Sequence, residues 1–119
     1  MRIVVADDNS LYRAAICNML GKDPIYQVVA EAEDGHAAIQ AVEKHRPDLV
    51  LMDVTMPVLD GFDATRVIKS KFPEVRVIIL SMHDVESISE TAYKAGACWC
   101  LNKGCSPNEI RQAIMTAGI

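Results

Sequence analysis

Residues 48–53 read Asp-Leu-Val-Leu-Met-Asp, an apolar run of four residues enclosed by two carboxylates. The run from Leu49 to Met52 contains no alternating polar residue, which is typical of a strand buried on both faces of a sheet. A parallel strand buried in this way needs helices on both sides, so the segment predicts an α/β domain. Asp53 stands where this strand ends, at the edge where α/β sheets bind ligands. We therefore take Asp53 as the candidate reactive residue.

The composition agrees with one such domain over residues 1–119. Hydrophobic residues make up 50% of the chain and aromatic residues only 5%, which predicts an aliphatic core and excludes disorder. A net charge of -4 without a basic stripe argues against direct binding of nucleic acid by this domain. No stretch resembles a membrane span or a signal peptide, and the 4 cysteines show no CxxC spacing. We expect a cytoplasmic protein with reduced thiols and no membrane partner.

Predicted strands and helices alternate along the whole chain. The strands are predicted at residues 3–6, 26–32, 49–52, 75–80 and 98–101. The helices are predicted from Asn9–Ser10 to about Gly21, over 37–45, from Asp60 to before Pro73, from Asp84 to Gly96 and from Pro107 to about Ala117. Right-handed crossovers between such units predict a flavodoxin-like fold, with a five-stranded parallel sheet of order 2-1-3-4-5 and five helices on both faces.

Polar side chains follow four of the predicted strands. Asp7 and Asp8 follow the first strand, Asp53 the third, Ser81 the fourth and Lys103 the fifth. Parallel strands all emerge at one edge of the sheet, so these side chains should converge there. The clustered carboxylates would repel one another unless a hard divalent cation such as Mg²⁺ were bound among their oxygens. With Lys103 and Ser81 holding the phosphoryl oxygens, the predicted chemistry is phosphoryl transfer to Asp53 as in-line nucleophile.

In this order and spacing, the motifs resemble those of the receiver domain of two-component response regulators, and the resemblance covers essentially the whole chain. The motifs are Asp7-Asp8, Asp53 with Met56-Pro57 and Asp60-Gly61, Ser81, Ala95-Gly96-Ala97 and Lys103. The resemblance implies that a sensor histidine kinase, or a small phosphodonor, phosphorylates Asp53. It also allows homodimerisation on phosphorylation. The domain would catalyse only its own phosphorylation and dephosphorylation, so it would not be an enzyme with a separate substrate.

The same resemblance implies roles for the remaining site residues. Asp8, Asp53 and the backbone carbonyl of Thr55 would ligate Mg²⁺ directly, and Asp7 would act through water. Ser81 would move to bond the phosphoryl group, and Lys103 would pair with it. A haloacid-dehalogenase-like hydrolase is an alternative, because it also uses an aspartate as nucleophile. The pattern of that family has a second Asp two residues after the nucleophile, where this chain has Thr55.

The finer pattern resembles receivers joined to a LuxR-type helix-turn-helix, which implies transcription regulation through a DNA-binding domain outside this chain. It is carried by Ala6-Asp7-Asp8-Asn9, Met52-Asp53-Val54-Thr55-Met56-Pro57, Ala64-Thr65, Leu80-Ser81-Met82-His83 and Gly104-Cys105-Ser106-Pro107. The sequence ends at Ile119. We expect an excised domain, with a stand-alone receiver as the alternative.

Four positions depart from the family pattern, one of which is Trp99, where a small residue is common. Cys100 stands three residues before the lysine, where the family often has the aromatic residue of a rotameric switch. Asn102 replaces a residue that is usually apolar, and Gly104 follows the lysine in place of proline or aspartate. A pseudo-receiver that works without phosphorylation therefore remains an alternative. Cys98, Cys100 and Cys105 are expected to be structural thiols rather than zinc or redox ligands, and His83 either tunes phosphoryl lifetime or is an exposed loop residue.

Overall fold

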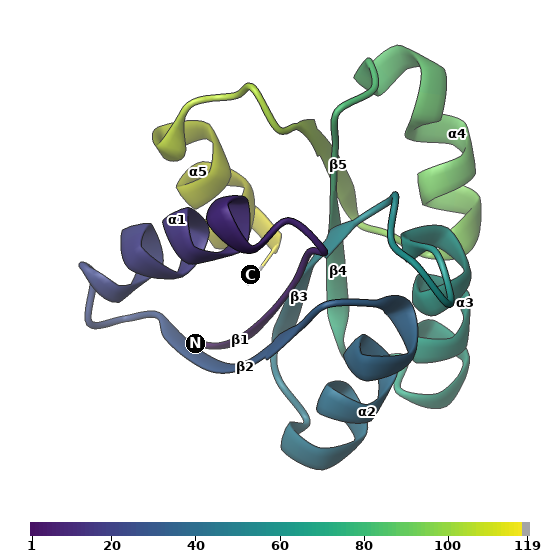
Figure 1. Ribbon diagram of the computed structural model, residues 1–119, viewed down its shortest axis with the longest axis horizontal. Helices are drawn as coiled ribbons and strands as arrows, with labels where there is room; N and C mark the ends of the chain where they lie inside the picture. Colours follow the sequence, from purple (N-terminus) through teal and green to yellow (C-terminus); the bar gives the residue numbers. More distant parts are fainter. Residues whose placement is uncertain (118–119) are drawn as a thin grey trace.

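The computed structural model describes residues 1–117, in which strands and helices alternate as predicted (Figure 1). The strands are β1 (Arg2–Ala6), β2 (Gln27–Ala32), β3 (Leu49–Asp53), β4 (Arg76–Ser81) and β5 (Trp99–Asn102). The helices are α1 (Ser10–Gly21), α2 (Gly35–His45), α3 (Gly61–Lys71), α4 (Val85–Ala95) and α5 (Pro107–Ala117). The last two positions of the predicted domain, 118–119, lie outside the described residues.

The five strands form one parallel sheet in the order β2-β1-β3-β4-β5, which confirms the predicted topology. The register aligns Ala6 with Met52 and Asp53 with Leu80, so β1, β3 and β4 end at nearly the same level. Ser81, the last residue of β4, is aligned with Asn102 of β5. The residues at and just after these four strand ends therefore meet at one edge of the sheet.

The helices cover both faces of the sheet, with α1 and α5 on one face and α2, α3 and α4 on the other (Figure 1). All five residues of β3 are buried, because this strand lies between two neighbours and two helical layers. The core clusters on the two faces are mainly aliphatic, as the composition predicted. None of the helices within residues 1–117 has both the length and the apolar character needed to cross a bilayer.

Side chains cap most of the helices where the sequence predicted. The carboxylate of Asp60 accepts a hydrogen bond from Asp63 N at 2.9 Å, and Asn9 caps α1. The predicted start of α2 at residue 37 is wrong by two residues, because the Asp34 carboxylate caps the helix by accepting from Ala37 N at 2.7 Å. Asp84 is the N-cap of α4 as predicted, but its side chain makes no capping hydrogen bond.

Candidate functional site

The predicted site residues converge at the edge where the strands end. Lys103, just after β5, reaches across this edge, and its Nζ lies 2.7 Å from Asp7 Oδ2 and 3.1 Å from Asp53 Oδ1. Asp7 is 2% exposed and Asp53 4% exposed, and the Lys103 side chain is 9% exposed. The structure therefore holds an ammonium between two carboxylates in a largely desolvated pocket.

Burial and ion pairing shift the pKa values of Asp53 and Lys103 in opposite directions. Burial raises the pKa of Asp53 to about 6, hydrogen bonding to Lys103 opposes that rise, and the neighbouring Asp7 and Asp8 carboxylates add to it. Burial by itself would lower the pKa of Lys103, but its hydrogen bonds to Asp7 and Asp53 outweigh that effect and raise it. Lys103 therefore remains charged at neutral pH. The ionised form of Asp53 is less favourable in the folded protein than in water.

Asp53→Asn should make the metal-free protein more stable at neutral pH. The pKa of Asp53 in the folded protein lies above the ordinary 3.8, so the folded state binds this proton more tightly than the unfolded state. The free energy of unfolding should therefore fall as pH rises through that window, by about 2 kcal/mol between roughly pH 4 and pH 6. Urea unfolding in EDTA should show Asp53→Asn more stable than wild type at pH 7 and nearly equal at pH 4.

Asp84 offers the matched control for this prediction, because it is exposed and its side chain makes no capping hydrogen bond. Asp84→Asn should leave the difference between pH 4 and pH 7 as it is in the wild type. The prediction would be contradicted if the wild type gained stability relative to Asp53→Asn as the pH rises from 4 to 7.

Asp7, Asp8 and Asp53 each offer a carboxylate oxygen, and these oxygens all lie within 4.8 Å of one another. Within residues 1–117 this is the only such group of three or more potential metal ligands, and all its donors are oxygens. A set of clustered, partly buried carboxylates of this kind fits Mg²⁺, which prefers hard oxygen donors and retains water on its open side. Asp8 is exposed, so that open side faces solvent. The 4 cysteines are free thiols and belong to no such group.

Ser81, at the end of β4, and Lys103, just after β5, are joined by hydrogen bonds around these two strand ends. The buried Ser81 hydroxyl accepts from His83 N at 2.9 Å, and the Ser81 carbonyl accepts from Lys103 N at 2.8 Å. Asn102 extends this connection, since its Nδ2 donates to the His83 carbonyl at 3.1 Å and its Oδ1 accepts from Gly104 N at 2.7 Å. The departure at position 102 therefore supplies an amide link between the β4–α4 and β5–α5 loops.

Cys100 departs from the family pattern in a different way. It is buried in the core on the face that α4 covers, and its Sγ lies 3.9 Å from the Tyr93 hydroxyl on α4. Burial raises the pKa of the Cys100 thiol, so it remains protonated at neutral pH. The position that holds a switch aromatic in the family is thus a small packing residue here.

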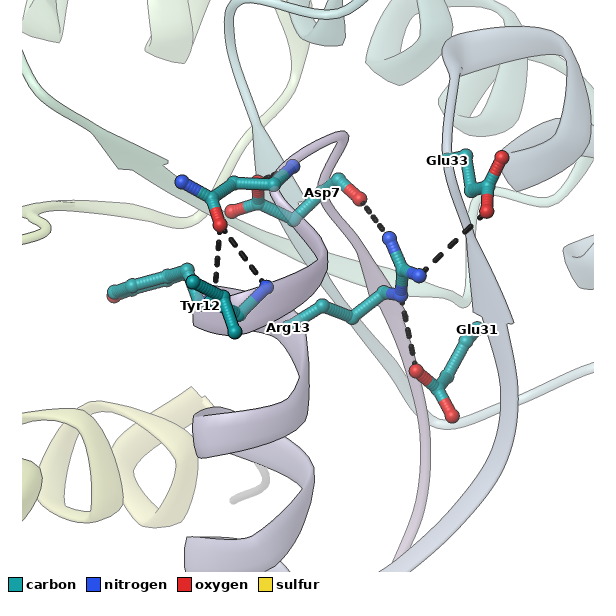
Figure 2. A network of polar contacts seen from close by, with 7 residues as sticks. Asp7, Tyr12, Arg13, Glu31 and Glu33 are labelled. Atoms are coloured by element: carbon teal, nitrogen blue, oxygen red, sulfur yellow. Dashed lines mark hydrogen bonds and ion pairs between the residues drawn. The ribbon is translucent and has the colours of Figure 1, made fainter.

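Arg13 and Tyr12, which were not singled out from the sequence, lie in the first turns of α1 beside Asp7 (Figure 2). Arg13 Nη1 donates to the Asp7 backbone carbonyl at 2.6 Å, and its guanidinium also pairs with Glu31 at 3.0 Å and Glu33 at 3.7 Å. These contacts fix the backbone that carries Asp7 to β2. Their position in the sequence could have indicated this role. Asn9 caps the helix two residues after Asp7, so residues in the first turns of that helix lie near Asp7.

The β3–α3 loop, which contains Thr55, is anchored at both ends by backbone hydrogen bonds. Gly61 N donates to the Val54 carbonyl at 2.8 Å, and Gly35 N donates to the Leu59 carbonyl at 3.0 Å. Thr55 is exposed and is the second residue after the end of β3. Val58 in this loop has a φ of 69°, a left-handed conformation that is strained for a β-branched residue.

Val58→Asn should stabilise the protein by about 1 kcal/mol, because asparagine tolerates the left-handed region and valine does not. The lost apolar contact costs little, since Val58 is 81% exposed. The measurement is the midpoint of urea unfolding. Val58→Thr retains the branched Cβ and should unfold close to the wild type. Equal midpoints for Val58→Asn and Val58→Thr would show that the loop is not strained at this residue.

Comparisons with known proteins agree on the family of the fold and site. A family model described as the response regulator receiver domain matches residues 3–115. The transcriptional regulatory protein DegU of Brevibacillus brevis is 39% identical over 114 residues, which cover 96% of this chain and 48% of DegU. This chain spans about half the length of such relatives, as it also does for the regulator NarL of Mycobacterium tuberculosis, of which it covers 53%.

Solved structures show the same likeness. The signal receiver domain of NarL from Mycobacterium tuberculosis has a TM-score of 0.93 and 34% identity, and the match covers 98% of this chain and 94% of that one. A LuxR-family two-component response regulator from Aurantimonas sp. SI85-9A1 has a TM-score of 0.91 and 35% identity, over 97% of this chain and 82% of the other.

Proposed function

The chain belongs to the response regulator receiver family, and from that membership we propose that it accepts a phosphoryl group on Asp53 and thereby switches an output. The predicted family and its LuxR-type branch are confirmed by these relatives. The observation that carries the proposal is the contact of Lys103 Nζ with both Asp7 and Asp53 in a desolvated pocket. An ammonium held beside a buried carboxylate, with further carboxylates for a metal, suits an aspartyl phosphate.

Asp53 is the nucleophile in this proposal. One of its carboxylate oxygens attacks the phosphorus of a phosphohistidine on a sensor histidine kinase, so that a P–O bond forms as the P–N bond breaks. The phosphoryl group ends on Asp53 as an acyl phosphate, and the departing imidazole takes up one proton. Acetyl phosphate can serve in the same way, with acetate as the leaving group. The chain would act on itself and not on a separate substrate.

Lys103 and Ser81 receive the charge of the transferred group. Lys103 Nζ lies 3.1 Å from Asp53 Oδ1, so it needs only a small shift to pair with an oxygen bound to phosphorus. The Ser81 hydroxyl already accepts from His83 N, which leaves its own proton free to donate to a second phosphoryl oxygen. Removing either side chain should slow phosphorylation, with Lys103 the more important because it carries charge.

Asp8, Asp53 and the Thr55 carbonyl would hold Mg²⁺ directly, and Asp7 would do so through water. When bound, Mg²⁺ would neutralise charge on the carboxylates and on the phosphoryl oxygens. The carboxylate oxygens within 4.8 Å of one another support this assignment. Lys103 would remain as the positive charge on the other side of Asp53.

The names of the relatives support the proposed output. DegU is named as a transcriptional regulatory protein, and this chain covers 48% of it. We infer that phosphorylation here controls a DNA-binding domain carried outside these residues, and that homodimerisation on phosphorylation is part of that control. A shift between existing inactive and active conformations would carry the signal.

The test is phosphorylation of the purified chain with acetyl phosphate, followed by intact mass. Wild type with Mg²⁺ should gain the mass of one phosphoryl group, and it should gain none in EDTA. Asp53→Asn should gain none under either condition, while the surface control Asp84→Asn should behave as wild type. A wild-type chain that stays unmodified would contradict the proposal and favour a pseudo-receiver. A gain that persists in Asp53→Asn would exclude Asp53 as the acceptor.

A further inference from the structure

Tyr12 lies in the pocket, but the chemistry proposed above does not use it. It is half buried in the first turn of α1, where its backbone N–H donates to Asn9 Oδ1 at 3.1 Å. Its hydroxyl is buried and has no hydrogen-bond partner among residues 1–117. Its ring, in contrast, has a close polar neighbour: Lys103 Nζ lies 4.7 Å from the ring centroid.

The ring supplies a third neighbour for the Lys103 ammonium. An ammonium has three N–H donors, and two carboxylates, from Asp7 and Asp53, lie within 3.1 Å of this one. The ring of Tyr12 is at a distance at which the negative face of an aromatic ring attracts a cation. Because the Lys103 side chain is only 9% exposed, water competes little for the ammonium, and the attraction is stronger than at an open surface.

We propose that Tyr12 is a positioning residue of the phosphotransfer site, whose ring holds the Lys103 ammonium beside Asp53 by a cation–π contact. The effect on rate rests on the proposed function, but the contact itself does not. The ring, and not the hydroxyl, carries this role, because the hydroxyl has no partner and the ring has Lys103.

A neutral ring suits a position whose charged neighbours change. During transfer, Lys103 would exchange Asp53 Oδ1 for a phosphoryl oxygen, so one of its two carboxylate contacts is altered. A cation–π contact is less directional than a hydrogen bond and can persist through such a shift. A third carboxylate in its place would add negative charge against the incoming phosphoryl group, whereas the ring adds none.

The first measurement is the rate of phosphorylation by acetyl phosphate with Mg²⁺. Tyr12→Leu should react roughly tenfold more slowly, the size expected for loss of a desolvated cation–π contact. Tyr12→Phe retains the ring and should react within about twofold of wild type. In a Lys103→Gln background, Tyr12→Leu should cause no further loss, because the cation it positions is gone.

Thermal unfolding of each variant separates positioning from general damage. Tyr12→Phe should unfold at or above the wild-type temperature, since it removes a buried hydroxyl without a partner. If Tyr12→Leu does not fold, Tyr12→Met is measured in its place. A rate loss as large in Tyr12→Phe as in Tyr12→Leu, or an undiminished loss in the Lys103→Gln background, would overturn the proposal.

The second measurement needs no phosphorylation. A methylene group next to an ammonium above a ring experiences a ring current, so the NMR signals of the Lys103 ε-protons should lie upfield of those of exposed lysines. The upfield shift should remain in Tyr12→Phe and vanish in Tyr12→Leu. Its absence in wild type overturns the role of Tyr12. If the shift is present but wild type accepts no phosphoryl group, the contact stands and the proposed function fails.

Discussion

Gly61→Ala should destabilise the protein by about 3 kcal/mol or more, because the added methyl group has no space. A Cβ at this position would lie 1.9 Å from the Asp53 carbonyl oxygen and 2.8 Å from the Asp53 carbonyl carbon. Both atoms belong to the backbone, so no side chain can rotate away and the loop itself must shift. The hydrogen bond from Gly61 N to the Val54 carbonyl holds the two segments together and prevents an easy shift.

The consequences of this substitution should reach the site, because the clash is with the residue that bears the proposed acceptor. We expect weaker Mg²⁺ binding together with a lower urea midpoint. Gly21→Ala is the matched control, since a Cβ at Gly21 meets nothing within 4 Å at the end of α1. It should be neutral or stabilising by up to about 1 kcal/mol. Equal effects of the two substitutions would contradict the close packing of Gly61 against β3.

Lys103→Met should destabilise the metal-free protein at pH 7 by about 2–4 kcal/mol, because it leaves two buried carboxylates without their cation. Asp7 and Asp53 are 2% and 4% exposed, so water cannot replace the ammonium. The loss should shrink as the pH falls toward 5, since Asp53 in the variant takes up a proton more readily than in wild type. Urea unfolding in EDTA at both pH values measures this difference.

Mg²⁺ should compensate for the missing lysine. A cation bound to the folded state alone raises the free energy of unfolding, and it should do so more for Lys103→Met than for wild type. Lys94→Met is the matched control, because Lys94 pairs with Glu90 at 2.9 Å on the exposed face of α4. Its loss should cost less than about 1 kcal/mol at any pH. A Lys103→Met variant as stable as Lys94→Met would show that the ammonium does not offset the carboxylate repulsion.

Apart from the strand order, which was expected from right-handed crossovers, the features that the sequence predicted correctly are set by local patterns. The unbroken apolar run 49–52 predicted the central strand β3, and strand ends followed by polar residues predicted where Asp53, Ser81 and Lys103 would lie. The capping residues at Asn9 and Asp60 placed the starts of two helices. In each case the signal and the structure involve residues within a few positions of one another.

The features that the sequence could not predict depend on contacts between distant segments. Asn102 looked like a departure from an apolar pattern, and only the fold shows its amide reaching His83 on the neighbouring loop. The ring of Tyr12 meets Lys103 because the first turn of α1 and the residue after β5 lie at the same edge of the sheet. The left-handed conformation of Val58 is likewise invisible in a sequence, since valine disfavours that region.

These contacts bear on the relay of the signal. Cys100 replaces the switch aromatic. The amide of Asn102 connects the loop after Ser81 with the loop that contains Lys103. Movement of either residue toward a phosphoryl group would act on this connection. Two of the departures from the family pattern, Asn102 and Gly104, thus take part in one local polar link.

The most direct test of the central claim is chemical identification of the phosphorylated residue. An acyl phosphate on aspartate is reduced by borohydride to homoserine, which tandem mass spectrometry can locate in the sequence. After treatment with acetyl phosphate and Mg²⁺, we expect homoserine at position 53 in wild type and at no aspartate in the EDTA control. Homoserine at Asp7 or Asp8, or at no position in the phosphorylated protein, would contradict this claim.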